Sequence, residues 1–165
     1  MSNVLGRILI VDDEPAILEV LTAFFSDGRF EVVTAEHGAD AVMIAKAHRP
    51  DAVLLDIIMP GMDGIKVLRA IRTMDPSIPV VMLTAADHEK VARDTITMGA
   101  FDYVSKPFDY GDLYGIVAAA VTAGAGHGWS AFGVHRAAPR ARVLAAEEIA
   151  ALVRNGGTQV HSAAS

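Results

Sequence analysis

The sequence predicts an α/β domain: a doubly wound sheet of five parallel strands in the flavodoxin-like order 2-1-3-4-5, with a short helical or disordered C-terminal extension. Short apolar runs rich in β-branched residues recur along the first 123 residues, and helix-length segments separate them. Continuous runs of this kind are typical of parallel strands that helices cover on both faces. Strands that alternate with helices through right-handed crossovers leave few other topologies.

The first half of the domain begins with an apolar run at 7–11, which predicts a strand. A helix is expected from Pro15, because proline fits the first turn of a helix. Apolar residues then recur at helical spacing to about Ser26. A short strand at 30–34 and a helix at 38–48 complete this half.

The second half repeats the alternation of strand and helix. The expected elements are, in order, a strand at 52–55, a helix at 64–74, a strand from Ile78, a helix at 89–98, a strand at 101–104 and a helix at about 109–122. Gly99 stands where a left-handed residue ends the fourth helix. The strand order places the first and third strands side by side, at the point where ligands bind in such sheets.

Composition limits the classes of protein that the chain can belong to. At 165 residues and 52% hydrophobic content, it can bury one good core and carry a small appendage. A net charge of -6 argues against nucleic acid as the main partner. The absence of cysteine excludes disulfides and thiolate nucleophiles. The first apolar run is too short for a signal peptide or a membrane span, so we expect a cytoplasmic protein without a membrane partner.

The charge balance changes at a glycine-rich joint. Residues 1–123 hold 10 Lys and Arg against 18 Asp and Glu, whereas residues 124–165 hold 4 against 2. We therefore place a domain at 3–123 and a joint with a tail at 124–165. A helix at 138–155 would put apolar side chains on one face, suited to docking on the domain or on a partner. A loosely ordered tail is the alternative.

Polar residues of different chemistry follow four of the apolar runs. They are Asp12 and Asp13 after the first, Asp56 after the third, Thr84 after the fourth and Lys106 after the fifth. Because the carboxyl ends of parallel strands lie at one edge of the sheet, these side chains should converge. Each residue alone also fits a turn, a helix cap or a solvated surface charge. Their joint placement favours one site.

Three clustered carboxylates predict a cation. Two negative charges about 4 Å apart repel by roughly 4 kcal/mol at an effective dielectric near 20, and a set of oxygen ligands with room for water suits Mg2+. Asp56 is then the natural nucleophile toward phosphorus. Lys106 and the Thr84 hydroxyl would cover further phosphoryl oxygens. The sequence thus predicts a phosphoryl-transfer site.

The chain resembles the receiver domain of bacterial two-component response regulators over 3–123. The motifs that carry the resemblance are Ile8-Leu9-Ile10-Val11-Asp12-Asp13-Glu14, Asp56-Ile57-Ile58-Met59-Pro60-Gly61-Met62-Asp63-Gly64, Leu83-Thr84-Ala85 and Lys106-Pro107-Phe108. The resemblance implies that Asp56 is the phosphoacceptor and that Lys106-Pro107 is a cis bond. It implies Mg2+ ligands on four residues: Asp12, Asp13, Asp56 and the backbone carbonyl of Ile58. It also implies that Thr84 and Lys106 read the phosphorylated state and that Tyr103 is the switch aromatic.

The partners follow from the same resemblance. A histidine kinase or phosphotransfer protein would supply the phosphoryl group, and a downstream protein effector would read it. The chain would catalyse only its own phosphorylation and dephosphorylation, and a homodimer formed on phosphorylation is left open. Residues 124–165 are too few for a winged-helix or helix-turn-helix unit, so we expect no DNA-binding domain.

Two other functions remain open from the sequence. A Mg2+-dependent phosphohydrolase of the haloacid dehalogenase type also uses an aspartyl nucleophile, but by resemblance it needs an acid/base Asp where this chain has Ile58. An interaction module gated by phosphorylation would act through the tail helix. In receiver domains, the residues at Ile58 and Ala86 flank the attacking water, and neither side chain here can orient it. We therefore expect slow self-dephosphorylation.

Overall fold

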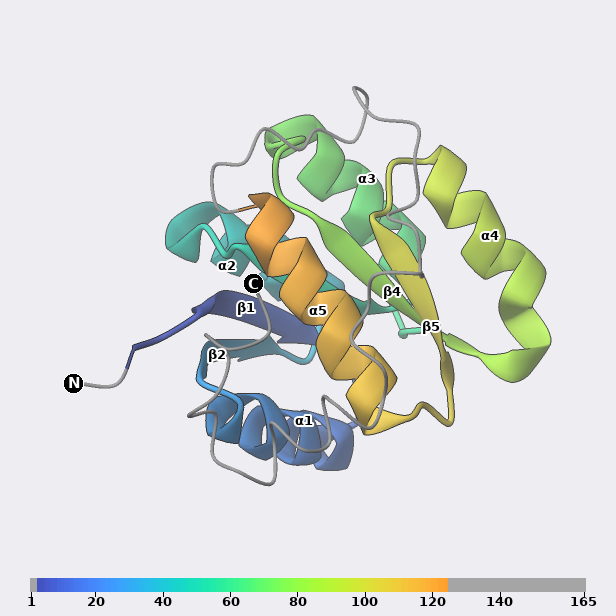
Figure 1. The fold of residues 1–165 in the computed structure, drawn as a ribbon. Coiled ribbons are helices and arrows are strands. Elements are labelled where there is room, and N and C mark those ends of the chain that lie inside the picture. The colour runs from blue at the N-terminus through green and yellow to red at the C-terminus, as the bar shows by residue number, and fades with distance from the viewer. Residues whose placement is uncertain (1–2, 125–165) are drawn as a thin grey trace.

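The computed structural model describes residues 3–124, which form one five-stranded sheet with helices on both faces (Figure 1). The elements are β1 (Gly6–Val11), α1 (Pro15–Asp27), β2 (Phe30–Ala35), α2 (Gly38–His48), β3 (Ala52–Asp56), α3 (Gly64–Met74), β4 (Val80–Ala85), the 3-10 helix η1 (Ala86–His88), α4 (Glu89–Thr97), β5 (Asp102–Lys106) and α5 (Tyr110–Gly124). All strand pairs are parallel, in the order β2-β1-β3-β4-β5. The predicted fold class is confirmed. The predicted tail helix at 138–155 lies outside the described residues.

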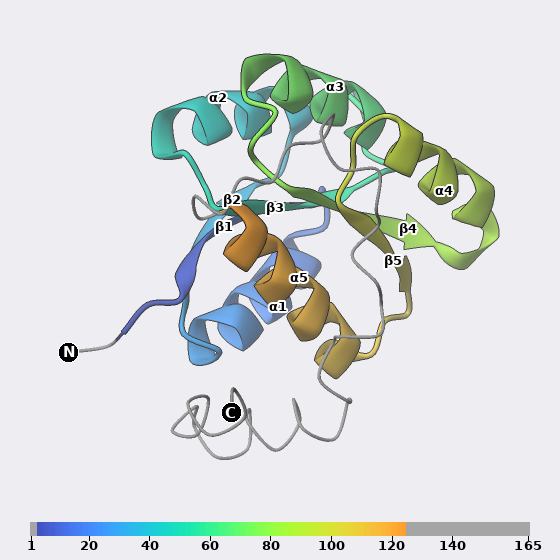
Figure 2. The same cartoon turned by 45° about the horizontal axis from the view of Figure 1, so that its top comes forward.

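Alternate residues of each strand enter different cores. In β1, Ile8 and Ile10 pack with α1 and α5, whereas Leu9 and Val11 pack with α2, α3 and α4. Figure 2 shows these two helical layers on either side of the sheet. Both faces of a central strand are therefore buried, which is why its sequence reads as an unbroken apolar run.

The strand register brings the site together. Val11 of β1 pairs with Leu55 of β3, so Asp12 and Asp56 follow neighbouring positions at the carboxyl edge of the sheet. On the other side of β3, Asp56 pairs with Leu83, and Thr84 comes directly after it. β5 completes the edge with Lys106. This is the edge at which doubly wound sheets bind ligands.

Some element boundaries differ from those predicted. β4 begins at Val80 and not at Ile78, because the intervening Pro79 has no N–H to donate to the ladder. The short helix η1 was not predicted, and α5 extends two residues past the predicted end at 122. Gly99 has φ 98° and the Lys106-Pro107 bond is cis, which confirms both of those predictions.

The helices formed by residues 3–124 include none that is long and apolar enough to cross a bilayer. The cytoplasmic location stays a prediction.

Candidate functional site

Three carboxylates meet at the carboxyl edge of the sheet. Asp12 and Asp13 follow β1, Asp56 ends β3, and one oxygen of each lies within 4.8 Å of the others. Asp12 and Asp56 are buried, and Asp13 is half-buried. The structure thus brings together the three predicted carboxylate ligands. A compact set of oxygen donors that is partly open to solvent fits Mg2+, which keeps several waters when bound.

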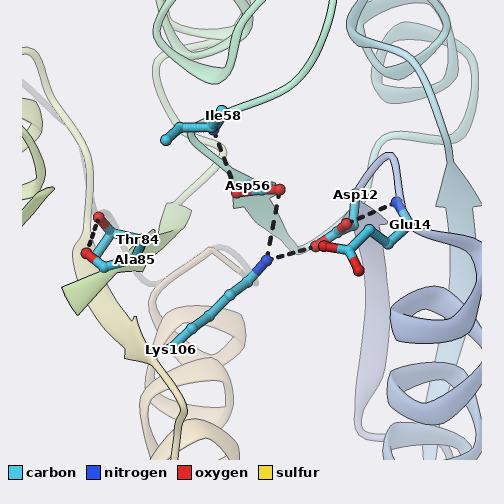
Figure 3. A network of polar contacts seen from close by, with 7 residues as sticks. All are labelled: Asp12, Glu14, Asp56, Ile58, Thr84, Ala85 and Lys106. Carbon is cyan, nitrogen blue, oxygen red and sulfur yellow. Dashed lines mark hydrogen bonds and ion pairs between the residues drawn. The ribbon is translucent and has the colours of Figure 1, made fainter. Parts of the chain in front are cut away.

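The ammonium group of Lys106 lies between two of these carboxylates (Figure 3). Its Nζ is 3.0 Å from Asp12 Oδ2 and 3.5 Å from Asp56 Oδ2. Burial alone would lower the pKa of Lys106, but the hydrogen bond to Asp12 and the charges of Asp12 and Asp56 outweigh it and raise that pKa. Lys106 therefore stays charged and partly neutralises the acidic cluster.

Asp56 sits in an environment that opposes its ionisation. Burial raises the pKa of its carboxyl; Lys106 lowers it, Asp12 raises it again, and the net direction is upward. The N–H of Ile58 donates to Asp56 Oδ1 at 3.3 Å and orients the group. A second cation, in addition to Lys106, would favour the ionised carboxylate of Asp56. The electrostatics of the three carboxylates therefore suit a divalent metal.

Asp12 is the most fixed of the three carboxylates. Its side chain is fully buried, and its Oδ1 accepts a hydrogen bond from the backbone N–H of Glu14 at 2.9 Å while Oδ2 accepts from Lys106. The contribution of Glu14 was not predicted. An aspartate side chain commonly accepts a hydrogen bond from the backbone N–H two residues further on in a turn, so the sequence did carry the signal.

Thr84 and Tyr103 lie near the site but not in the acidic cluster. Thr84 is buried at the end of β4, and its hydroxyl donates to the Ala85 carbonyl at 3.1 Å, away from the carboxylates (Figure 3). Tyr103 is partly buried in β5 and packs against the core under α2, α3 and α4. Their roles as readers of the phosphorylated state stay predictions.

The loop after β3 approaches Asp56 closely on one side. A Cβ on Gly64 would overlap the Asp56 carbonyl oxygen, and the Gly64 N–H donates to the Ile57 carbonyl at 2.8 Å. Asp63 caps α3 by accepting from the Lys66 N–H at 3.0 Å. The Ile58 side chain is 54% exposed. A metal contact from its backbone carbonyl stays a prediction.

Comparison with known proteins gives concordant results. The family model described as the response regulator receiver domain matches residues 8–118. Regulatory protein AtoC of Escherichia coli is 42% identical over 68% of this chain and 24% of its own length. DNA-binding response regulator MtrA of Mycolicibacterium smegmatis is 41% identical over 66% of this chain and 47% of its own.

Solved structures of receiver domains have a fold similar to that of this chain. A response regulator receiver domain protein from Clostridium thermocellum has a TM-score of 0.69 and 29% identity, covering 71% of this chain and 94% of its own. The receiver domain of NtrX from Brucella abortus has a TM-score of 0.67 and 32% identity, covering 70% of this chain and 98% of its own.

One prediction is corrected by the curated relatives. The chain spans less than half of their length, and they include a DNA-binding response regulator and transcriptional regulatory proteins. The prediction of no DNA-binding domain is therefore wrong. It rested on the size of 124–165 and on an acidic net charge. Neither the size of this segment nor the net charge is informative, because a regulator can carry the basic face that nucleic acid requires on a part other than its acidic receiver domain.

Proposed function

Because the chain belongs to the family of response regulator receiver domains of two-component systems, we propose that it accepts a phosphoryl group on Asp56 and signals through its phosphorylated state. The observation that carries the proposal is the convergence of Asp12, Asp13 and Asp56 within 4.8 Å, with the Lys106 ammonium beside them. Positioned charges of this kind are the main requirement of phosphoryl transfer.

Asp56 is the nucleophile of the proposed transfer. One of its carboxylate oxygens forms a bond to phosphorus while the bond between phosphorus and the donor nitrogen breaks, and the histidine of the donor retains the electron pair. Asp12, Asp13 and Asp56 would hold Mg2+, which supplies charge neutralisation on the phosphoryl oxygens. Lys106 provides a second positive charge, because its Nζ already reaches Asp56 Oδ2 at 3.5 Å. The N–H of Ile58 orients the attacking carboxylate.

The donor is proposed to be a histidine kinase or phosphotransfer protein, and the reader a downstream effector. The chain then catalyses only the gain and loss of its own phosphoryl group. The names of relatives such as MtrA and PrrA support a transcriptional output for the whole regulator.

Incubation with acetyl phosphate tests the proposal directly. We expect the intact mass of the full chain to increase by one phosphoryl group when Mg2+ is present and to stay unchanged when a chelator removes it. An increase that persists in the chelator would contradict the metal requirement. Steady release of phosphate without an adduct would instead indicate a phosphohydrolase. If neither an adduct nor released phosphate is detected, both functions are excluded.

Ile58→Asn should accelerate loss of the phosphoryl group. The exposed hydrocarbon side chain of Ile58 cannot bind water, whereas an amide two residues after Asp56 can orient the attacking molecule. One such hydrogen bond is worth about 1 kcal/mol, which corresponds to roughly a fivefold change in rate. The decay of the phosphorylated protein, followed by mass, measures this rate.

Met62→Asn is the matched control for Ile58→Asn. Met62 is an exposed apolar residue of the same loop, but it makes no described contact with Asp56. Its substitution should leave the decay rate unchanged. Equal acceleration in both variants would show that loop polarity, and not the position beside Asp56, controls the rate.

A further inference from the structure

The loop between β3 and α3, residues 57–63, carries a group that orients Asp56. The N–H of Ile58 donates to Asp56 Oδ1 at 3.3 Å (Figure 3). The hydrogen bond from the Gly64 N–H to the Ile57 carbonyl, at 2.8 Å, closes the base of the loop. This bond fixes the two ends of the loop, so the place of Ile58 also depends on what the rest of the loop contacts.

The loop contacts α2 at Gly38. Gly38 is the buried first residue of α2, and a Cβ built on it would lie 2.5 Å from the Met62 carbonyl oxygen and 2.9 Å from the Met62 Cβ. A third neighbour is Val67 Cγ2 of α3, at 2.8 Å. These approaches are closer than close packing allows. A side chain at position 38 would therefore push the backbone of Met62 away from α2.

The backbone at position 38 does not itself require glycine. The glycines with positive φ in the described part of the chain are Gly61 and Gly99, and Gly38 is not one of them. Glycine is also among the weakest helix formers, so alanine would suit the start of α2 better if there were room for its methyl group. The missing side chain therefore serves the contact with the loop.

We propose that Gly38 is a positioning residue for the phosphoryl-transfer site. By letting the backbone of Met62 lie against α2, it holds the loop where the Ile58 N–H reaches Asp56. The inference rests on the proposed function, because an oriented Asp56 carboxylate favours both the binding of Mg2+ and the attack on phosphorus. Gly38 offers no side chain to the metal or to the phosphoryl group, and it acts through the loop.

Amide exchange in the full chain without Mg2+ tests the positioning itself. We expect the Ile58 amide proton of Gly38→Ala to exchange with water about fivefold faster than that of the unsubstituted chain, the factor that one typical hydrogen bond is worth. Gly124→Ala is the matched control, because a Cβ there would overlap the Asp51 carbonyl oxygen at the amino edge of the sheet. It should leave the exchange of Ile58 unchanged. An unchanged rate in Gly38→Ala, or equal acceleration in both variants, would overturn the proposal.

Calorimetric titration with Mg2+ measures the consequence at the site. The dissociation constant of Mg2+ should rise about fivefold in Gly38→Ala and stay unchanged in Gly124→Ala. Equal dissociation constants for Gly38→Ala and the unsubstituted chain would overturn the proposal. If the unsubstituted chain binds no Mg2+, the proposed metal site is contradicted, and the exchange rates of Ile58 still decide the role of Gly38.

A second substitution, Val67→Ala, separates the two contacts of the added methyl group and guards against loss of the fold. In Gly38→Ala with Val67→Ala, removal of Val67 Cγ2 makes room on the side of α3, whereas the overlap with the Met62 carbonyl oxygen remains. Compared with Val67→Ala alone, the double variant should still show faster exchange at Ile58 and weaker binding of Mg2+. Equality of these two variants would overturn the proposal, because crowding of Val67 and not of the loop would then be the cause.

Discussion

Replacing Asp56 with Asn is expected to abolish phosphoryl uptake from acetyl phosphate in the presence of Mg2+. The amide keeps the size of the carboxyl group but is not a nucleophile toward phosphorus, and it removes one of the three anionic groups that lie within 4.8 Å of one another. Removal of a nucleophile typically lowers a rate by far more than about a thousandfold. Intact mass measured over time gives the rate for both proteins.

Asp63→Asn provides the matched control for this substitution. It makes the same chemical change in the loop after β3, and asparagine caps a helix as well as aspartate does, so the hydrogen bond from the Lys66 N–H is retained. Uptake should stay at the rate of the unsubstituted chain. If the Asp56→Asn protein still gains one phosphoryl group at that rate, another residue is the acceptor.

Gly64→Ala should destabilise the fold by about 3 kcal/mol, at the upper end of the usual cost of overpacking. The added Cβ would overlap the Asp56 carbonyl oxygen and lie 2.7 Å from the Ile57 Cα. Both are backbone atoms at or next to the end of the buried strand β3, so they cannot move aside without moving Asp56. Urea denaturation measures the loss, and phosphoryl uptake should fall with it.

Gly61→Ala separates this crowding from backbone strain. Gly61 has φ 78°, and a Cβ there would meet nothing within 4 Å. Its substitution should therefore cost only the strain of a left-handed backbone, about 1 to 2 kcal/mol. A larger loss for Gly61→Ala than for Gly64→Ala would mean that the close approach to Asp56 is relieved by movement of the loop.

The fold could be predicted because the sequence patterns that specify its strands and helices are local and recur along the chain. The three central strands, β1, β3 and β4, each contain an unbroken run of four apolar residues. Both faces of β1 are buried, so the pattern of Ile8 to Val11 identifies a parallel strand without reference to any partner. The carboxyl-edge rule then placed Asp12, Asp13 and Asp56 together, and the structure does the same. The cis bond at Lys106-Pro107 came from family resemblance and not from spacing.

Other features of the site depend on contacts that no local pattern encodes. The hydroxyl of Thr84 bonds to the Ala85 carbonyl, a choice between rotamers that depends on the packing around it. The crowding at Gly64 arises because the loop folds back on β3, and an Asp-Gly pair in the sequence indicates only a turn. The absence of a DNA-binding domain was wrongly predicted because charge and length describe one part of a regulator.

The hydrogen bond between Lys106 and Asp12 joins residues 94 positions apart. Contacts of such long range form late, because the chain between them must first be gathered at an entropic cost. Pairing of β1 with β3 is enough to bring Asp12, Asp13 and Asp56 together. The Lys106 ammonium reaches them only when β5 joins the sheet. The site is therefore complete only when β5 has joined the sheet, so its geometry depends on assembly of the whole domain.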